Sequence, residues 1–306
     1  GKAAGFFAVG TGAERKGRSG AVVISTDSDL NPICMKEVFG RNESGSNPIN
    51  DFHQVVLYKG KKCAVVGSTQ TGVDPSCGEA ENSDVLFTFA TFHNCKLSKT
   101  KQVGAEDVNE WGRAIAVEGK NLVIAGNARK VNKDPPNCPP PNYDDILLFQ
   151  MKKNAKVKYP TRYDVDKNED VGMSVVYRKN TKTFLVAGET KTDKFTDDGE
   201  ESKDLFLLET DKKLKFNNFE IFGGEKDESG ETDLVLSPDH NAVILGNSKS
   251  FGTDDRQNMY LIERYDNVAQ TCHDMRMKLE SKSVKLKSAD AIEVRNKNIL
   301  HADVDL

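Results

Sequence analysis

The chain has 306 residues, of which 37% are hydrophobic and 29% are charged, and its formal net charge is −4. A slightly acidic chain without a concentrated basic patch is not expected to bind nucleic acid. No stretch approaches the roughly 18 consecutive apolar residues that cross a membrane, so we expect no membrane span. The lysines of residues 276–287 alternate with Leu and Val, which favours a solvated edge strand over a nucleic-acid surface.

A short apolar run that ends in glycine recurs along the chain. It reads FFAVG, CAVVG, LVIAG, FLVAG and AVILG, and its glycines are Gly10, Gly67, Gly126, Gly188 and Gly246. Their separations are 57, 59, 62 and 58 residues. Recurrence at a nearly fixed period indicates an array of similar structural units.

Each glycine run belongs to a group of four strand signals bounded by turn residues. The strand before it reads FHQVVLY, GRAIAVEG, GMSVVYRK, TDLVLSPD and DAIEVRN, and the strand after it reads GAVVIS, DVLFTF, DILLFQ, DLFLLE and NMYLIE. The fourth strand is less regular: ICMKEVFG, CKLSKTKQVG, KVKYPTRY, KLKFNNFEIFGG and the stretch around CHDMRMKL. No amphipathic helical pattern of about ten residues or more interrupts these groups, which argues against an α/β fold.

The recurrence predicts an all-β fold made of repeats at 1–43, 44–104, 105–165, 166–224 and 225–280, with 281–306 as closing strands. One four-stranded antiparallel sheet cannot bury both of its faces, and radial stacking of such sheets gives a β-propeller. The first repeat lacks its first strand, so we predict that DAIEV supplies its inner strand and closes a ring of five blades. Six blades are the alternative, with ILHADV in an incomplete last repeat. We expect residues 1–306 to form a single domain.

Two stretches resemble known propeller repeats. FGGEKDESGETDLVLSPDHNAVILGNSKSFGTDDRQNMYLIERYDN resembles bacterial-type secreted β-propeller repeats, and WGRAIAVEGKNLVIAGNA looks like the FG-GAP repeat of integrin-type propellers. Kelch-like propellers are similar in general pattern. The resemblance covers nearly the whole chain at low identity and implies the fold. It implies hardly any activity, because propellers serve as enzymes, lectins and adhesion modules alike.

An even number of cysteines, without a CxxC pair or zinc-ligand spacing, favours disulfides and a secreted, extracellular protein. The six cysteines are Cys34, Cys63, Cys77, Cys95, Cys138 and Cys272. We expect most of them to be bridged. The pairing that we favour is Cys77–Cys138, because both residues occupy the same loop in adjacent repeats. Cys34, Cys95 and Cys272 share another repeat position, near the start of the fourth strand. Reduced thiols in a cytosolic protein are the alternative.

Acidic residues stand at the start of every first strand, where the loops of a propeller meet at one face. Representatives are Asp51, Glu110, Asp170, Glu231 and Asp290. Converging carboxylates suit Ca²⁺, which takes six to eight oxygen ligands, and this face is the predicted binding site. The alternative is that each acid accepts hydrogen bonds from its own turn.

Oxygen-bearing side chains also alternate in one loop, at Asp164, Asp166, Asn168 and Asp170. The spacing imitates the start of an EF-hand loop, but the required glycine and the final glutamate are missing. The pattern therefore predicts only a generic calcium loop.

Three further residues near the first strands are candidates for chemistry. Trp111, the only tryptophan, and Arg113 could line a small-molecule or glycan pocket, although packing between blades is the plainer reading of Trp111. His53, two residues from Asp51, is a candidate general base. Asn42 begins a glycosylation sequon, as in a secreted glycoprotein.

These observations predict a secreted or cell-surface β-propeller that binds a protein or glycan partner through one loop face. The alternative is a secreted propeller enzyme that acts on a small molecule in the central channel. Such an enzyme would be a calcium-dependent lactonase or esterase, or a cofactor-free oxygenase.

Overall fold

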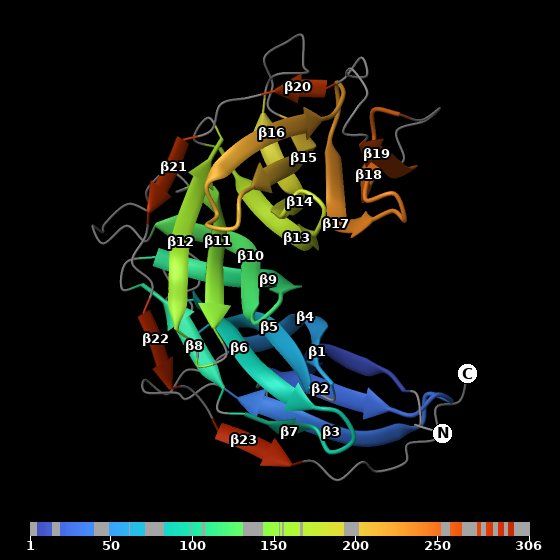
Figure 1. Ribbon diagram of the computed structural model, residues 1–306, viewed down its shortest axis with the longest axis vertical. Coiled ribbons are helices and arrows are strands. Elements are labelled where there is room, and N and C mark those ends of the chain that lie inside the picture. Colours follow the sequence, from blue (N-terminus) through green and yellow to red (C-terminus); the bar gives the residue numbers. More distant parts are fainter. Residues whose placement is uncertain are drawn as a thin grey trace. The chain divides into compact units, whose positions relative to one another are not determined.

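The computed structural model shows a chain built of strands joined by turns and loops (Figure 1). It describes residues 5–13, 19–39, 49–60, 62–70, 83–98, 100–105, 108–130, 143–152, 154, 156–165, 168–192, 202–251 and 258–264, together with the short C-terminal segments 274–276, 280–283, 287–290 and 293–296. No helix occurs in these ranges. The all-β prediction is therefore confirmed for the described part of the chain.

The chain divides into two compact units, Gly1–Glu106 with Ser288–Leu306, and Asp107–Lys287. The strands of unit 1 are β1 (Phe7–Ala13), β2 (Ser19–Thr26), β3 (Pro32–Phe39), β4 (Ile49–Lys59), β5 (Lys62–Gln70), β6 (Ser83–Thr91), β7 (Lys96–Leu97), β8 (Lys101–Gly104), β22 (Lys287–Asp290) and β23 (Glu293–Asn296). The antiparallel strands β1–β2–β3 and β4–β5–β6–β8 correspond to the first two predicted repeats. One parallel bridge, Ser19 to Ile49, joins the two sets.

Unit 2 contains the next three repeats. Its strands are β9 (Val108–Glu118), β10 (Asn121–Lys130), β11 (Asp144–Lys152), β12 (Val157–Asp164), β13 (Asp170–Arg178), β14 (Thr183–Thr192), β15 (Ser202–Thr210), β16 (Phe216–Phe222), β17 (Glu228–Leu236), β18 (Ala242–Ser248), β19 (Asn258–Arg264), β20 (Asp274–Arg276) and β21 (Glu280–Ser283). β9–β12, β13–β16 and β17–β19 each form an antiparallel sheet in chain order. Sheets of this kind are consistent with propeller blades, whereas the ring and the number of blades stay predictions.

The C-terminal strands are placed differently from the prediction. The segment near CHDMRMKL was expected to complete the fifth repeat, but β20 instead pairs with β16 of the fourth. DAIEV was expected at the inner edge of the first repeat, beside β1. Instead, β23 pairs with β3, at the opposite edge of that set, and Asp290 ends β22 beside β8. The expectation is therefore wrong in the described segments, because the tail strands β20 to β23 add to outer edges. ILHADV lies outside the described residues.

The recurring glycine marks a β-bulge on the neighbouring strand. The pairing of β9 with β10 shifts register at this point, so that Arg113 of β9 is an extra residue opposite Gly126 of β10. A Cβ atom on Gly126 would lie 1.8 Å from the carbonyl oxygen of Trp111. The corresponding distance is 1.9 Å at both Gly67 and Gly188. Glycine is required here because backbone approaches backbone, as predicted for these positions. Gly246 differs, since its Cβ would meet the side chain of Leu205.

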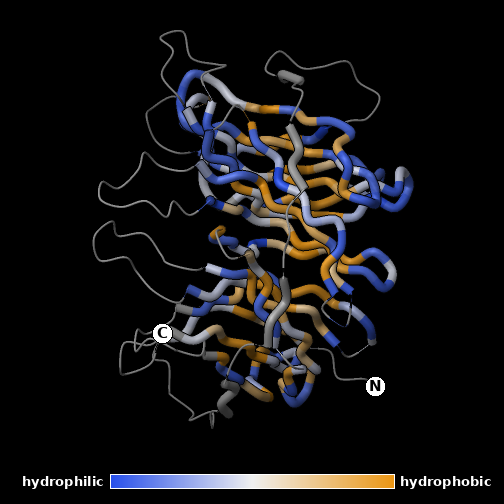
Figure 2. The backbone as a smooth tube through the Cα atoms, turned by 90° about the vertical axis from the view of Figure 1, so that its left-hand side faces the viewer, coloured by the Kyte–Doolittle hydropathy of each residue, from blue (hydrophilic) through white to orange (hydrophobic). Residues whose placement is uncertain are grey.

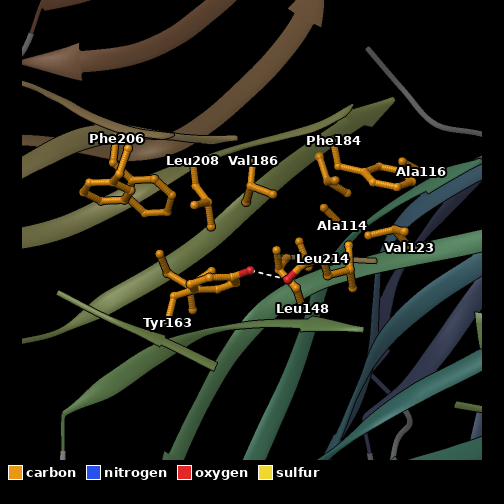
Figure 3. Close-up of a cluster of buried hydrophobic side chains, with 14 of the residues drawn as sticks. Ala114, Ala116, Val123, Leu148, Tyr163, Phe184, Val186, Phe206, Leu208 and Leu214 are labelled. Carbon is orange, nitrogen blue, oxygen red and sulfur yellow. Dashed lines mark hydrogen bonds between the residues drawn. The ribbon is translucent and has the colours of Figure 1, made fainter. Parts of the chain in front are cut away.

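Apolar side chains from neighbouring sheets of unit 2 form its core. Figure 2 shows hydrophobic residues concentrated in the strands and hydrophilic residues in the turns between them. Ala114, Val123 and Leu148 of β9–β11 pack with Phe184 and Phe206 of β14 and β15 (Figure 3). A second cluster joins β13–β16 to β17–β19. Each of these sheets is thus held mainly by burial against its neighbour in sequence.

A buried hydrogen bond from a tyrosine also fastens the two sheets at the first of these interfaces. The hydroxyl of Tyr163, at the end of β12, donates to the backbone carbonyl of Leu214, in the turn before β16 (Figure 3). Tyr163 is fully buried, and burial raises the pKa of its hydroxyl. Its polar tip is therefore satisfied inside an otherwise apolar core.

A disulfide joins Cys34 to Cys95 in unit 1, with their Cα atoms 5.8 Å apart. The two residues share a repeat position near the start of the fourth strand, as the sequence showed. Cys63, on β5, was expected to be bridged but carries a free, buried thiol. Cys77, Cys138 and Cys272 lie outside the described residues, so the pair Cys77–Cys138 stays a prediction.

Candidate functional site

Mostly polar residues occupy one level of each sheet in unit 2. The register aligns Glu110 with Ala128 and Asp145, Asp170 with Thr190 and Asp204, and Glu228 with Ser248 and Asn258. Every carboxylate in these rows is at least nine-tenths buried. We call this level the polar tier. On the second strand of each sheet, the polar tier lies two residues after the recurring glycine. Its position in the sequence therefore follows the same period as the repeats.

Asp170, predicted to bind a ligand or calcium, holds its own turn. Its Oδ2 accepts the Val165 amide at 2.7 Å, and its Oδ1 accepts the Thr190 hydroxyl at 2.6 Å. Burial raises the pKa of Asp170 well above its usual range. The amide of Asn168 donates to the carbonyl of Val165 within the same turn. These contacts follow the alternative reading, in which the acids satisfy local backbone donors.

The wider calcium prediction receives no support from the described residues. They contain no group of three His, Cys, Asp or Glu side chains that could hold a metal ion. Asp164 is half-buried at the end of β12, and Asp166 lies outside the described residues. The carboxylate Oδ1 of Asp51 accepts the Ser68 amide at 2.9 Å, as a turn-holding acid would.

Asp204 and Glu228 form the most unusual part of the polar tier. Glu228 is fully buried and accepts hydrogen bonds from the Gly224 amide at 2.7 Å, the Ser248 hydroxyl at 2.9 Å and the Ser250 amide at 3.2 Å. Asp204 is equally buried and has no hydrogen bond of normal length to a described donor; the nearby Ser202 side chain lowers its pKa, but by less than burial and Glu228 raise it. Burial, and then the negative charge of Glu228, raise the pKa of Asp204 to about 9. Asp204 is therefore the neutral acid of the two at pH 7.

The preceding sheet neutralises the equivalent carboxylate differently. Asp145 forms an ion pair with Arg162 of β12. The register places Ile221 of β16 where Arg162 stands, so Asp204 has no equivalent cation. A sequence-based analysis could have found Asp204 from its position in the repeat. The loss of its cation becomes visible only when the two sheets are aligned strand by strand.

Trp111 lies on β9 beside an arginine clamped by a carboxylate. The guanidinium of Arg129 lies 5.8 Å from the centre of the Trp111 ring. It also forms two hydrogen bonds to Asp144, at 2.9 and 3.0 Å. A cation over an indole face is an attractive arrangement, and the two-point ion pair fixes its orientation. Trp111 is only half-buried, so its ring is held and partly open to solvent.

Two other predicted residues, His53 and Arg113, are the extra residues of β-bulges, which can redirect side chains. In unit 1, His53 Nε2 lies 3.3 Å from Asp51 Oδ1. The sequence allowed this contact without requiring it. In unit 2, Arg113 Nε donates to Asn127 Oδ1 at 3.3 Å. The structure therefore pairs His53 with Asp51 and, separately, orients Arg113 against β10.

Glu189 was missed by the sequence analysis. It follows Gly188 and is buried, and its Oε1 accepts the Gly230 amide at 2.5 Å. Burial raises its pKa, whereas Gly230, Lys203 and Arg113 lower it. The Lys203 ammonium lies 3.7 Å from its other oxygen. The signal in the sequence is that Glu189 directly follows the recurring Gly188, as Asn127 follows Gly126.

The remaining predicted residues are spread over the chain. Glu110 is buried in the polar tier, and Glu231 lies in the bulged part of β17. Asn42, the glycosylation candidate, lies outside the described residues. The predicted site residues therefore do not form one described cluster, and most described acids have structural partners.

Comparison of the sequence with protein families and with curated proteins finds no match. The described residues contain no helix that is both long and apolar enough to cross a membrane. The fold and the polar tier define an all-β protein of repeated antiparallel sheets, consistent with blades of a propeller.

Proposed function

We propose that the protein is a secreted or cell-surface β-propeller whose ring of blades binds a protein or glycan partner through one loop face. The arrangement of Trp111, Arg129 and Asp144 carries this proposal. A half-exposed tryptophan held by an ordered cation is a typical anchor in binding sites, because it offers a large surface with little loss of side-chain freedom.

The position of this group in the chain supports a role in binding. Arg129 and Asp144 flank residues 131–142, which connect the second and third strands of their repeat and lie outside the described residues. The same connection follows β5, β14 and β18 in the other repeats. Successive loops of one type leave the same end of their sheets, and recognition residues are often carried by such loops. The Cys34–Cys95 disulfide supports an oxidising, extracellular location.

Trp111 provides the test, because its fluorescence is the chain's only tryptophan signal. Neutral, sialylated and sulfated oligosaccharides, and in a second arm extracellular protein fractions, would be screened for binding to the purified chain. A ligand of this site should change the fluorescence and bind at least about tenfold more weakly to Trp111→Ala. Tyr159→Ala, which removes another partly exposed aromatic ring, is the matched control. Equal binding by both variants would reject this surface.

A second candidate function is an enzyme acting on a small molecule, favoured by the His53–Asp51 contact. A carboxylate beside an imidazole can fix the orientation of the ring, as a general base requires. Aryl esters and lactones would be offered to the wild type and to His53→Ala, with and without Ca²⁺. Hydrolysis that is lost in the variant would support an esterase or lactonase. Identical background rates would leave the dyad structural.

A further inference from the structure

Arg113 differs from the other arginines whose side chains the structure describes, because it has no carboxylate partner among the described residues. Each of the others forms an ion pair, and the pairs are Arg129–Asp144, Arg162–Asp145, Arg178–Glu209 and Arg264–Glu220. The Arg113 side chain makes one hydrogen bond within the described part of the chain, from Nε to Asn127 Oδ1 at 3.3 Å. Its terminal Nη groups therefore keep their N–H donors for another acceptor.

The hydrogen bond to Asn127 fixes how this guanidinium is presented. Arg113 is the extra residue of the bulge opposite Gly126, and such a residue can turn its side chain away from the regular alternation of the strand. Asn127 is only 3% exposed, so it is a firm anchor for Nε. A guanidinium that is held through Nε offers its two Nη groups as a planar fork, which matches the two oxygens of a carboxylate.

The acid nearest in influence, Glu189 of the neighbouring sheet, does not cancel this positive charge. Its Oε1 accepts the Gly230 amide at 2.5 Å, and its Oε2 lies 3.7 Å from the ammonium of Lys203. Arg113 acts on Glu189 more weakly than Gly230 and Lys203 do. Two cations, Arg113 and Lys203, thus stand near one carboxylate, and the local net charge is positive. A positive charge of this kind attracts an anionic ligand.

The indole of Trp111 belongs to the same group of side chains. The register pairs Trp111 with Asn127, which is also the hydrogen-bond partner of Arg113. A flat aromatic ring beside N–H donors suits a sugar, because the apolar face of the sugar covers the ring while its oxygens accept hydrogen bonds. A carboxylate on a peptide would use the fork of Arg113 alone. A sugar that carries a carboxylate would use the fork and the ring together.

We propose that Arg113 binds the carboxylate of an acidic sugar, a uronic or sialic acid, while Trp111 packs against the sugar ring. This inference rests on the proposed function, because it names the class of glycan that would be bound beside Trp111. A neutral sugar would give the Nη donors of Arg113 no charged acceptor, and it should bind more weakly for that reason.

Titrations followed by the fluorescence of Trp111 test the proposal. The probes are an oligosaccharide of uronic acids, a sialylated oligosaccharide and the carboxyl-reduced form of each, which keeps the ring and loses the charge. The wild type should bind one of the acidic probes at least about tenfold more tightly than its reduced form. Arg113→Gln should abolish this preference by weakening the acidic probe alone. Arg113→Lys should restore only part of it, because an ammonium lacks the planar fork.

Lys158→Gln is the matched control, because it removes one positive charge from β12 and should keep the preference for the acidic probe. Thermal melts would establish that each variant is folded. Equal binding of the acidic and reduced probes by the wild type would overturn the inference. So would an equal weakening of both probes in Arg113→Gln, since the effect would then be general.

The proposed function and this inference fail in different ways. A neutral glycan or a protein whose binding depends on Trp111 but not on Arg113 would overturn the inference and leave the proposed function in place. An acidic peptide that binds through Arg113 more tightly than either acidic probe would overturn the assignment to a sugar. If no glycan and no protein binds in a way that depends on Trp111, both are rejected together.

Discussion

Asp204 and Glu228, on neighbouring sheets of unit 2, meet as a buried acid and a buried carboxylate. Glu228 takes its hydrogen bonds from Gly224, Ser248 and Ser250, which stabilise its charge. Asp204 has no hydrogen bond of normal length to a described donor, and burial together with the charge of Glu228 raises its pKa to about 9. The carboxylate of the nearby Asp227 forms an ion pair with Lys249, whose Nζ lies 3.0 Å from Oδ2. One proton therefore replaces the cation that Arg162 supplies in the preceding sheet.

This proton makes stability depend on pH. The pKa of Asp204 is raised in the folded state, from 3.8 to about 9, so the folded chain binds one more proton than the unfolded chain between these values. The contribution of this proton to the free energy of unfolding is complete below about pH 4 and is lost as the pH rises towards 9. We expect the free energy of unfolding to fall by up to about 1.4 kcal/mol per pH unit from this group.

Asp204→Asn is the variant that checks this slope. An amide stays neutral and can donate to Glu228, so urea unfolding from pH 6 to 9 should show a flatter profile than the wild type. Asp227→Asn is the control, because Asp227 has a lowered pKa and should not flatten the profile in this window. Parallel profiles for wild type and Asp204→Asn would contradict a shared proton.

The glycine opposite the bulge should not tolerate substitution by a residue with a side chain. Gly188→Ala would place a methyl group 1.9 Å from the backbone oxygen of Val171, and the paired strands leave little room to move. We expect a loss of about 3 kcal/mol in the free energy of unfolding. Gly10→Ala is the matched control in the first repeat, where a Cβ has nothing within 4 Å. It should be neutral or slightly stabilising, and equal losses in both variants would refute the role of the bulge.

The Cys34–Cys95 disulfide should contribute strongly to unit 1. It closes a long loop, with a sequence separation of 61. The double variant Cys34→Ser/Cys95→Ser should lose roughly 2–4 kcal/mol in the free energy of unfolding measured without reductant. Adding reductant should shift the wild type towards the variant and leave the variant unchanged. Peptide mapping that finds Cys34 and Cys95 as free thiols would show the bridge to be absent.

The two readings of Asp170 predict different responses to calcium. Asp170→Ala removes the acceptor of the Val165 amide and the Thr190 hydroxyl, so it should cost roughly 1–3 kcal/mol for each donor left unpaired. A turn-holding role predicts the same loss in EDTA and in millimolar Ca²⁺. A melting temperature that Ca²⁺ raises in the wild type but not in Asp170→Ala would instead restore the calcium loop.

The order of the strands was largely predictable, because it depends on local patterns. Apolar runs with turn residues between them define most strands from Phe7 to Arg264, and the period of the recurring glycine aligns the repeats. The bulge opposite Gly67, Gly126 and Gly188 agrees with the predicted close approach of backbones. The exception is the tail, whose strands β20 to β23 are only three or four residues long. Segments this short carry little preference of their own, so their partners depend on which edges are open.

The sequence by itself determined the all-β class, the repeat and the residue types at each repeat position. It did not determine which carboxylates are charged, because charge state depends on partners contributed by other strands. Asp145 and Asp204 occupy the same position of successive repeats, yet one meets Arg162 and the other Glu228. The pairing of Cys34 with Cys95, the contact of His53 with Asp51 and the clamp of Arg129 beside Trp111 likewise join residues from different strands. Only the tertiary structure decides these contacts, because side chains far apart in sequence interact once the sheets bring them within a few ångströms.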